Sequence, residues 1–220
     1  NERPQRLVID SFPAGILGEL QGLKELEGLH CIYLARILKI DRYLQRLDAG
    51  AKLPPISEVI RLEKLSDVHE DFLEKIGAPI SYLQLIDPPC PPDPAISAVL
   101  PREFDLIIHS GNDDESLQLY RLAEETAALE KRSPDFVVIT AGNRPGFLPA
   151  GVLHLHCYPA TRVIDLAGCV FSAAGFNIMR QMALKNTRHE AMPMPRALDD
   201  QFFRAAWHRD HKQQKFAQRA

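Results

Sequence analysis

Three short segments in the C-terminal half of the chain carry residues that suit the binding of a ligand. They are residues 156–159, 172–177 and 195–201, and each follows a short apolar run that is typical of a buried strand. Runs of this kind favour a parallel sheet, in which ligands bind outside the carboxyl ends of the strands. We therefore expect the three segments to converge on one crevice that binds a nucleotide-bearing ligand.

The middle segment has the chemistry of an anion site. Residues 168–172 read as a strand, an Ala-Ala-Gly turn follows at 173–175, and residues 176–184 have the spacing of a helix. Small residues allow a sharp turn and let a ligand approach the first N–H groups of the helix closely. These N–H groups and the positive end of the helix dipole suit a diphosphate. Ordinary packing of a strand against a helix explains the same turn, so that alternative stays open.

The order of the motifs carries a family resemblance. Ser172-Ala-Ala-Gly-Phe-Asn177 is followed by Gln181, then by Met192-Pro-Met-Pro195 and Asp199-Asp-Gln201. This order resembles the C-terminal signature of GT-B glycosyltransferases, and it is most similar to glycosyltransferase family 28, which includes the peptidoglycan N-acetylglucosaminyltransferases. The resemblance covers the last half of the chain well and the first half loosely. It implies a Rossmann-like GT-B donor-binding domain with a parallel sheet, plus part of a second α/β domain.

The resemblance places the donor diphosphate of a UDP-sugar between two loops. One is the turn that opens the helix after residue 175, and the other follows an apolar strand at 104–109 and matches the phosphate-facing Gly/Ser loop of the family. The residues implied in the two loops are Ser172, Ala174, Gly175, Phe176, Asn177, Ser110, Gly111 and Asn112.

The resemblance also implies contacts to the rest of the donor. His156 and Cys157 fall where the loop of the family flanks the uracil. Gln181 occupies the place of a glutamate that usually holds the ribose hydroxyls. The residues matched to the region of the sugar are Asp199, Asp200 and Gln201.

The chain departs from the family pattern at several of these positions. A carboxylate accepting from ribose hydroxyls contributes about 1.5–3 kcal/mol, whereas a neutral amide contributes about 0.5–1.5 kcal/mol. Gln181 is therefore expected to weaken donor binding about tenfold or to change the nucleotide accepted. Arg188 stands where the family usually has proline, and Gly168 where it often has aspartate. These departures slightly favour a protein that has lost catalysis.

Three acidic residues follow the loop at 110–112. Asp113, Asp114 and Glu115 would repel a diphosphate if they faced it. Alternatively they begin the next helix, where acidic residues interact favourably with the helix dipole. We favour the second interpretation.

The catalytic residues that we expect lie near the start of the chain. Asp10 ends a strand at 7–10, and the loop after it contains Gly15 and Gly18, which leave room for close backbone approach. In GT-B enzymes a glycine-containing loop of the acceptor domain faces the cleft between the domains. Transfer with inversion needs a general base for the acceptor hydroxyl, a role we assign to Asp10, with Glu19 near the reacting sugar. Alternatively, Asp10 begins a tight turn and Glu19 is a solvated helix residue.

The composition excludes several classes of function. The chain has 220 residues, 45% of them hydrophobic, which is enough for one large or two small domains. A net charge of −3 argues against a nucleic-acid-binding surface. We see no apolar run of membrane-spanning length and no N-terminal signal. We expect a cytoplasmic protein, whose oligomeric state is not readable.

The sequence gives little sign of a metal or a disulfide. His154 and His156 share one face of a strand, but no third ligand follows at a suitable spacing. The four cysteines are scattered and read as reduced cytosolic thiols. We expect no metal and no cofactor, with the UDP-sugar as a substrate.

The Pro-rich run divides the chain. Five prolines fall within the eight residues 87–94, which predicts an extended linker at 87–102. The predicted parts are a partial N-terminal, acceptor-side α/β domain at 1–86, this linker, a nucleotide-sugar-binding domain at 103–198, and a C-terminal helix at 199–220 that packs back toward the first domain. Because only about 85 residues precede the prolines, we expect a fragment that lacks the first half of the acceptor domain; a complete short protein is the alternative.

The predicted elements alternate between strand and helix, which indicates an α/β fold with right-handed crossovers. Strands are expected at 6–10, 31–38, 57–63, 80–86, 104–109, 135–140, 151–156, 168–172 and 188–193. Helices are expected within 13–28 and at 41–49, 67–76, 114–131, 160–167, 176–185 and 199–217.

These observations predict a glycosyltransferase, a hexosyltransferase when full-length, that transfers a sugar from a UDP-sugar to the hydroxyl of an unidentified acceptor. Two alternatives stay open. One is a non-catalytic nucleotide-sugar-binding or scaffold protein of the same fold, and the other is a UDP-sugar epimerase. The donor sugar, the acceptor and the stereochemical outcome are not readable.

Overall fold

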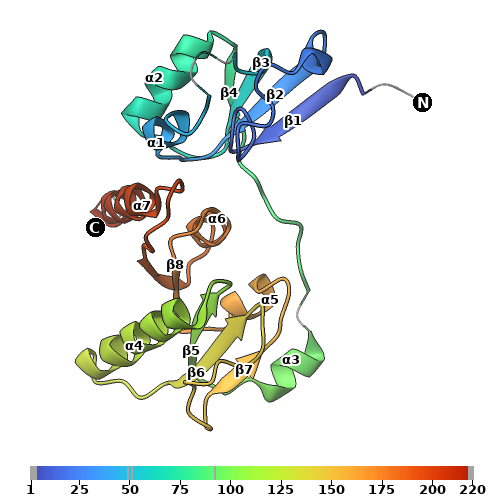
Figure 1. Cartoon of the computed structure of the whole chain (residues 1–220). Helices are drawn as coiled ribbons and strands as arrows, with labels where there is room; N and C mark the ends of the chain where they lie inside the picture. The colour runs from blue at the N-terminus through green and yellow to red at the C-terminus, as the bar shows by residue number, and fades with distance from the viewer. Residues whose placement is uncertain (1–3, 49, 51, 92, 218–220) are drawn as a thin grey trace. The chain divides into compact units, whose positions relative to one another are not determined.

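The computed structural model describes residues 4–48, 50, 52–91 and 93–217, with side chains as far as residue 211. The chain divides into two units (Figure 1). The first contains the residues up to Leu85 together with Pro195–Arg204, and the second contains Ile86–Met194 together with the C-terminal helix from Ala205 onward.

The first unit is built on a four-stranded parallel sheet in the order β1-β2-β3-β4. A 3-10 turn at Lys24–Leu26 and two helices lie in the connections between the strands. The elements are β1 Arg6–Asp10, β2 His30–Ala35, α1 Ile40–Leu44, β3 Ile56–Arg61, α2 Asp67–Ile76 and β4 Ile80–Tyr82.

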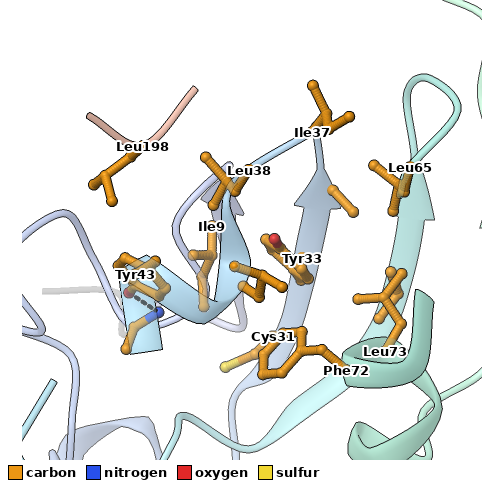
Figure 2. Packing of buried hydrophobic residues seen from close by; sticks show 14 residues of the cluster. Ile9, Cys31, Tyr33, Ile37, Leu38, Tyr43, Leu65, Phe72, Leu73 and Leu198 are labelled. Atoms are coloured by element: carbon orange, nitrogen blue, oxygen red, sulfur yellow. Dashed lines mark hydrogen bonds between the residues drawn. The ribbon is translucent and has the colours of Figure 1, made fainter. Parts of the chain in front are cut away.

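The two faces of this sheet differ in burial because of its strand order. Each strand lies beside the preceding one in the same direction, so right-handed crossovers put all connections on one face. On that face Tyr33 packs with Tyr43 of α1 and with Phe72 and Leu73 of α2 (Figure 2). Val8 points to the other face and is 57% exposed.

The second unit is built on a five-stranded parallel sheet in the order β7-β6-β5-β8-β9. Its strands are β5 Phe104–His109, β6 Asp135–Thr140, β7 Leu153–Leu155, β8 Cys169–Ala173 and β9 Arg188–Met192. Its helices are α3 Pro94–Val99, α4 Asp113–Leu129, α5 Thr161–Ile164 and α6 Phe176–Ala183, and α7 Gln201–Ala217 begins in the first unit.

Helices cover both faces of the second sheet. Strand order reverses at β5, so the crossovers fall on opposite faces. Ile107 and Phe171 pack against α4 on one face, and Leu106 and Val170 pack with α5 and α6 on the other. β8 is buried along its whole length. The α/β fold with parallel sheets that we expected from the sequence is confirmed.

The helix predicted within residues 13–28 is wrong. The structure has turns there and only the short 3-10 turn Lys24–Leu26. The reason is the backbone of four glycines, Gly15, Gly18, Gly22 and Gly28, which all have φ between +64° and +84°. This left-handed conformation interrupts a right-handed helix and is readily adopted by glycine alone.

The prediction of an extended linker at 87–102 is wrong in part, because helix α3 lies within it. Pro94 occupies the first turn, where its missing N–H costs nothing. The side chain of Asp93 caps the helix by accepting a hydrogen bond of 2.9 Å from the N–H of Ala95. The described part of the segment from Ile86 belongs to the second unit.

Most other predicted elements are present with different ends. The helix expected at 41–49 ends at Leu44, and the strands expected at 31–38 and 80–86 end at Ala35 and Tyr82. Predicted positions 1–3, 49, 51, 92 and 218–220 lie outside the described residues. No helix in the described part of the chain is both long enough and apolar enough to cross a membrane.

Candidate functional site

The candidate site lies at the point where strand order reverses in the second sheet. β5 and β8 are neighbours there, with Ile108 paired to Ser172 near their carboxyl ends. Chain order runs from β5 outward through β6 to β7 and then returns to β8 on the other side of β5. Open α/β sheets bind ligands outside the carboxyl ends of the strands at such a point. The fold therefore brings together two predicted loops, the one after β5 and the one after β8.

The N-terminus of α6 follows directly from the carboxyl end of β8. Gly175 is its N-cap residue, with φ −71° and ψ 152°, and as a glycine it has no side chain of its own to cap the helix. The first turn contains no acidic residue. Gly175 and Phe176 are half-buried and Asn177 is exposed, and a Cβ built on Gly175 would meet only open space. A helix end of this kind attracts an anion through its N–H groups and its dipole.

Two predicted contact residues in this turn are less accessible. Ser172 and Ala174 are fully buried. The hydroxyl of Ser172 lies 2.8 Å from Nε2 of His189 and donates to the carbonyl oxygen of Ala173 at 3.0 Å. The N–H of Ala174 donates to the carbonyl oxygen of Met192 at 3.2 Å. These two residues hold the turn in place, and the exposed surface comes from residues 175–177.

The N-terminus of α4 differs from that of α6. The side chain of Asn112 caps it by accepting from the N–H of Glu115 at 2.9 Å. Asp113, Asp114 and Glu115 form the first turn, which confirms our interpretation that these acidic residues begin a helix. A carboxylate-rich, side-chain-capped helix end is a poor anion site, so of these two helix ends that of α6 is the better suited to an anion.

The glycine in the loop after β5 has a packing role. Nε2 of His109 lies 2.8 Å from Oε2 of Glu115, and side-chain exposure is 5% for His109 and 14% for Glu115. A Cβ added to Gly111 would collide with both of these atoms. Ser110, Gly111 and Asn112 are exposed. Gly111 is therefore required by the pair behind it, whether or not a phosphate approaches the loop.

Replacing Gly111 with alanine is expected to separate His109 from Glu115 and to lower the free energy of unfolding of the second unit by about 1–3 kcal/mol, the cost of buried polar groups that lose their partner. The measurement is chemical denaturation. The matched control is Gly142→Ala, in a loop where a Cβ meets no atom within 4 Å. Equal stability of the two variants would contradict the packing role.

The residues predicted to flank the uracil lie further along the same edge of the sheet. His156 and Cys157 follow β7, which is three strand positions from β8, or about 14 Å at 4.8 Å per strand. His156 is exposed, whereas Cys157 is buried and its thiol donates to the carbonyl oxygen of Pro159 at 3.6 Å. His154 lies 2.9 Å from the hydroxyl of Thr140, and burial lowers the pKa of its imidazole.

Gln181 is bound to an aspartate that the sequence analysis missed. Its Nε2 donates to Oδ2 of Asp87 at 2.8 Å, and Nη2 of Arg180 donates to Oδ1 of the same carboxylate at 2.7 Å. Ninety-three residues separate Asp87 from Arg180, so no local spacing could have indicated the contact. The hydrogen bond from Arg180 lowers the pKa of Asp87, and the bond from Gln181 lowers it further.

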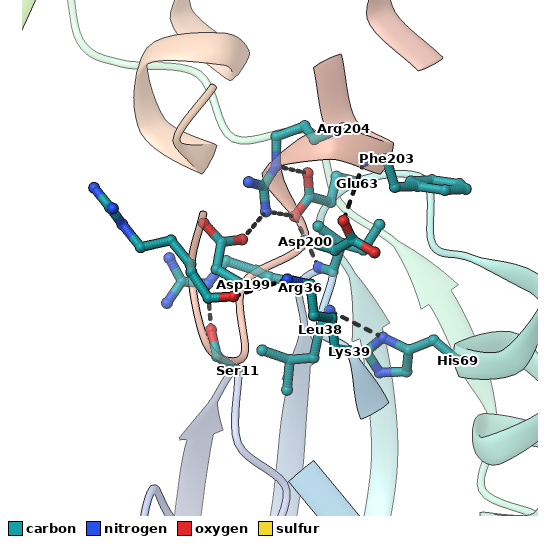
Figure 3. A network of polar contacts seen from close by, with 12 residues as sticks. Ser11, Arg36, Leu38, Lys39, Glu63, His69, Asp199, Asp200, Phe203 and Arg204 are labelled. Carbon is teal, nitrogen blue, oxygen red and sulfur yellow. Dashed lines mark hydrogen bonds and ion pairs between the residues drawn. The ribbon is translucent and has the colours of Figure 1, made fainter. Parts of the chain in front are cut away.

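The predicted sugar-binding residues lie in the first unit. Asp199 pairs with Nη2 of Arg204 at 2.8 Å, and its backbone bridges to that of Leu38. Asp200 directly precedes α7 and accepts from the N–H of Phe203 at 3.2 Å, while Gln201, the first residue of α7, is buried. The structure therefore assembles residues 195–201 with the first unit (Figure 3). The convergence of these residues with the loops after β5 and β8, which belong to the second unit, stays a prediction.

The two predicted catalytic residues have different surroundings. Asp10 is 57% exposed, and its Oδ2 lies 2.9 Å from Nη2 of Arg36. Glu19 folds over the turn at Gly15, and its Oε2 accepts from the N–H of Leu17 at 2.8 Å. Hydrogen bonds from its own N–H and from that of Leu17 lower the pKa of Glu19, which makes it a weaker base.

Ser11, beside Asp10, is held in an unusual conformation. Its φ is +65°, which is rare for residues other than glycine and can mark a functional site. Its carbonyl oxygen accepts from the hydroxyl of Tyr33 at 2.9 Å, and Tyr33 in turn lies 3.3 Å from Nε2 of His69. Burial lowers the pKa of His69 to about 4, so His69 is neutral at pH 7. Sequence periodicity gave no sign of this buried network.

A further cavity, of about 500 Å³, lies at the opposite edge of the second sheet. It is lined by residues 102–105, 132–134 and 166–168, which precede or begin β5, β6 and β8. Parallel sheets of this type bind ligands at the carboxyl ends of their strands, so we place the candidate site at β5 and β8.

Comparison with known proteins does not identify the chain. No protein-family model matches it, and no curated protein or solved structure matches it significantly. Among the described residues, no group of three His, Cys, Asp or Glu side chains is arranged to hold a metal ion.

Proposed function

We propose that this chain binds a nucleotide-sugar and belongs to a glycosyltransferase that transfers the sugar from a UDP-sugar to an acceptor hydroxyl. The observation that carries the proposal is the N-terminus of α6. It follows a buried strand at the point where strand order reverses, its N-cap residue is a glycine, and it has no acidic residue in its first turn. These are the properties of a diphosphate site.

The chemistry assigned to this site is stabilisation of the leaving group. When the bond between the sugar and the diphosphate breaks, negative charge develops on the diphosphate oxygen. The N–H groups at the start of α6 are preorganised to stabilise that charge, an effect that is usually large in enzymes. The acceptor hydroxyl must lose a proton, and Asp10 is the proposed base. The residues proposed to contact the sugar are Asp199, Asp200 and Gln201. His156 and Cys157 are proposed to flank the uracil of the nucleotide.

Calorimetric titration with UDP and UDP-sugars tests this function. We expect saturable binding of UDP, and release of UDP from a UDP-sugar when an acceptor is supplied. Absence of UDP binding at several millimolar nucleotide would refute the proposal.

The second candidate is a nucleotide-sugar-binding protein without catalysis. Two observations favour it. Gln181 has no charge of its own, and Arg188 forms ion pairs with Glu130 and Glu190 where the family usually has proline. Binding of UDP-sugar without release of UDP would indicate this function, and NMR detection of an isomerised UDP-sugar would indicate an epimerase.

A further inference from the structure

The cavity at the amino-terminal edge of the second sheet contains a carboxylate that is only half satisfied. Asp105, in β5, lines this cavity and is 1% exposed. Its Oδ2 accepts from Nη1 of Arg132 at 2.9 Å, whereas its Oδ1 forms no hydrogen bond with any residue that the structure describes. A buried, charged acceptor without a donor is unfavourable. A ligand that donates to Oδ1 would remove this cost.

Arg132 supplies an unpaired donor from the same ion pair. Its Nε donates to Oε2 of Glu130 at 2.8 Å and its Nη1 donates to Asp105. Its Nη2 is buried and forms no hydrogen bond within the described part of the chain. Arg132 also lines the cavity. One ion pair therefore offers a free acceptor, Oδ1 of Asp105, and a free donor, Nη2 of Arg132.

Gly168 leaves space beside the free acceptor. It lines the cavity and is exposed, and a Cβ added to it would lie 3.2 Å from Oδ1 of Asp105. The space that a side chain would fill at this position is therefore next to the unpaired oxygen. Oδ1 and Nη2 have almost no accessible surface themselves, so a ligand reaches them with a small movement of Arg132, whose side chain is 36% exposed.

The size and charge of the cavity favour a small neutral ligand. Its volume of about 500 Å³ lies in the range of small-molecule sites and far exceeds the roughly 30 Å³ of one water molecule. Asp105 would repel an anion and Arg132 would repel a cation. The other lining charges, Arg102 and Glu103, are exposed and opposite in sign. Leu166, which is 50% exposed, adds an apolar wall.

We propose that this cavity binds a small neutral ligand through an amide edge, which is an N–H group beside a carbonyl oxygen. The N–H donates to Oδ1 of Asp105, and the carbonyl oxygen accepts from Nη2 of Arg132. An alcohol carries its donor and acceptor on one atom, whereas an amide carries them on two and can meet both groups. Carboxamides and nucleobases both have such an edge. This binding goes beyond the proposed function, which concerns the other edge of the sheet.

The test is NMR titration of the full chain with nicotinamide and with uracil, read from the backbone chemical shifts of the lining residues 102–105, 132–134 and 166–168. Saturable shifts at these residues are expected. Methyl nicotinate and 1,3-dimethyluracil keep the ring and a carbonyl group but have no N–H. They are expected to bind about tenfold or more weakly, because the charged oxygen stays unpaired. Tighter binding of nicotinamide would indicate a carboxamide as the ligand, and tighter binding of uracil would indicate a nucleobase.

Gly168→Ala places a methyl group beside Oδ1 and is expected to weaken the binding of both probes about tenfold. The matched control is Gly146→Ala, in the loop between β6 and β7, where a Cβ meets no atom within 4 Å. This control should keep the wild-type affinity. If Gly168→Ala fails to fold, as judged by circular dichroism, Arg132→Lys provides the second reading. Lysine keeps a cation beside Asp105 but lacks the planar fork that holds Nη2, so affinity should again fall.

Several results would overturn the proposal. One is the absence of shifts at the lining residues with several tens of millimolar of either probe. Another is equal affinity for the probes with and without the N–H, and a third is wild-type affinity in Gly168→Ala. Uracil shifts confined to the loops after β5 and β8 would support the proposed function and overturn the binding of uracil in this cavity. Failure of UDP to bind would overturn the proposed function alone.

Discussion

Replacing Arg204 with methionine is expected to lower the free energy of unfolding of the first unit by about 3–5 kcal/mol, the usual cost of removing one partner from a buried ion pair. The side chain of Arg204 is 2% exposed, and it donates to Glu63 at 2.7 and 2.9 Å. Glu63 lies beside Arg204 (Figure 3) and is 11% exposed, and it also accepts a hydrogen bond from the N–H of Ile37. Methionine fills much of the volume and leaves the carboxylate of Glu63 without its cation.

The measurement is chemical denaturation, combined with hydrogen exchange of the amides in β2. Arg209→Met is the matched control, because Arg209 lies on the same helix and its side chain is 69% exposed. This control is expected to change stability by less than about 0.5 kcal/mol. The double variant Glu63→Leu with Arg204→Met should be more stable than the sum of the two single changes, since neither member of the buried Arg204–Glu63 pair is left alone. Equal stability of Arg204→Met and Arg209→Met would contradict the account.

Replacing Gly175 with aspartate is expected to weaken the binding of UDP and pyrophosphate by a factor of roughly 100, because a fixed carboxylate about 4 Å from the diphosphate repels it by several kcal/mol before screening. The variant should fold, since Gly175 has an ordinary extended conformation and its Cβ would meet open space. Aspartate is also a favourable N-cap residue. The stability of the second unit should therefore stay equal or rise while binding is lost.

Calorimetry of binding and chemical denaturation measure the two effects separately. Gly151→Asp is the matched control, because Gly151 shortly precedes β7, at the opposite edge of the sheet, and also has open space around it. Wild-type affinity in Gly175→Asp would place the diphosphate elsewhere. A loss of affinity equal to that of Gly151→Asp would show only an effect of net charge.

Most of the second sheet could be predicted from the sequence. Two of its strands agree with the prediction at both ends, Phe104–His109 and Asp135–Thr140, and so does the helix Asp67–Ile76 of the first unit. Continuous apolar runs and amphipathic spacing depend on local sequence alone, so they can be read without the structure. The helix expected within 13–28 was wrong because the positive φ of Gly15 and its neighbours depends on the turn as a whole. The conformation of a short connecting segment depends on packing against the rest of the unit, which the periodicity of hydrophobic residues in the sequence does not show.

The candidate site could be predicted only where chain order determines it. The loops after β5 and β8 become neighbours because of the strand order, and the sequence indicated both. The carboxylate of Asp87 and its partners Arg180 and Gln181 could not be found in this way, since the contact joins segments that are distant in the chain. Residues 195–201 were expected beside the α6 turn, and this stays a prediction, because they belong to the first unit and the α6 turn to the second.

The discontinuity of the first unit has a consequence for biosynthesis. Arg204 follows its partner Glu63 by 141 residues, and all strands of the second sheet lie between them in the sequence. In a chain emerging from the ribosome, the carboxylate of Glu63 is therefore present long before Arg204 has been synthesised. Strands β1 to β4 can pair early, but the first unit is completed only after the second has been synthesised.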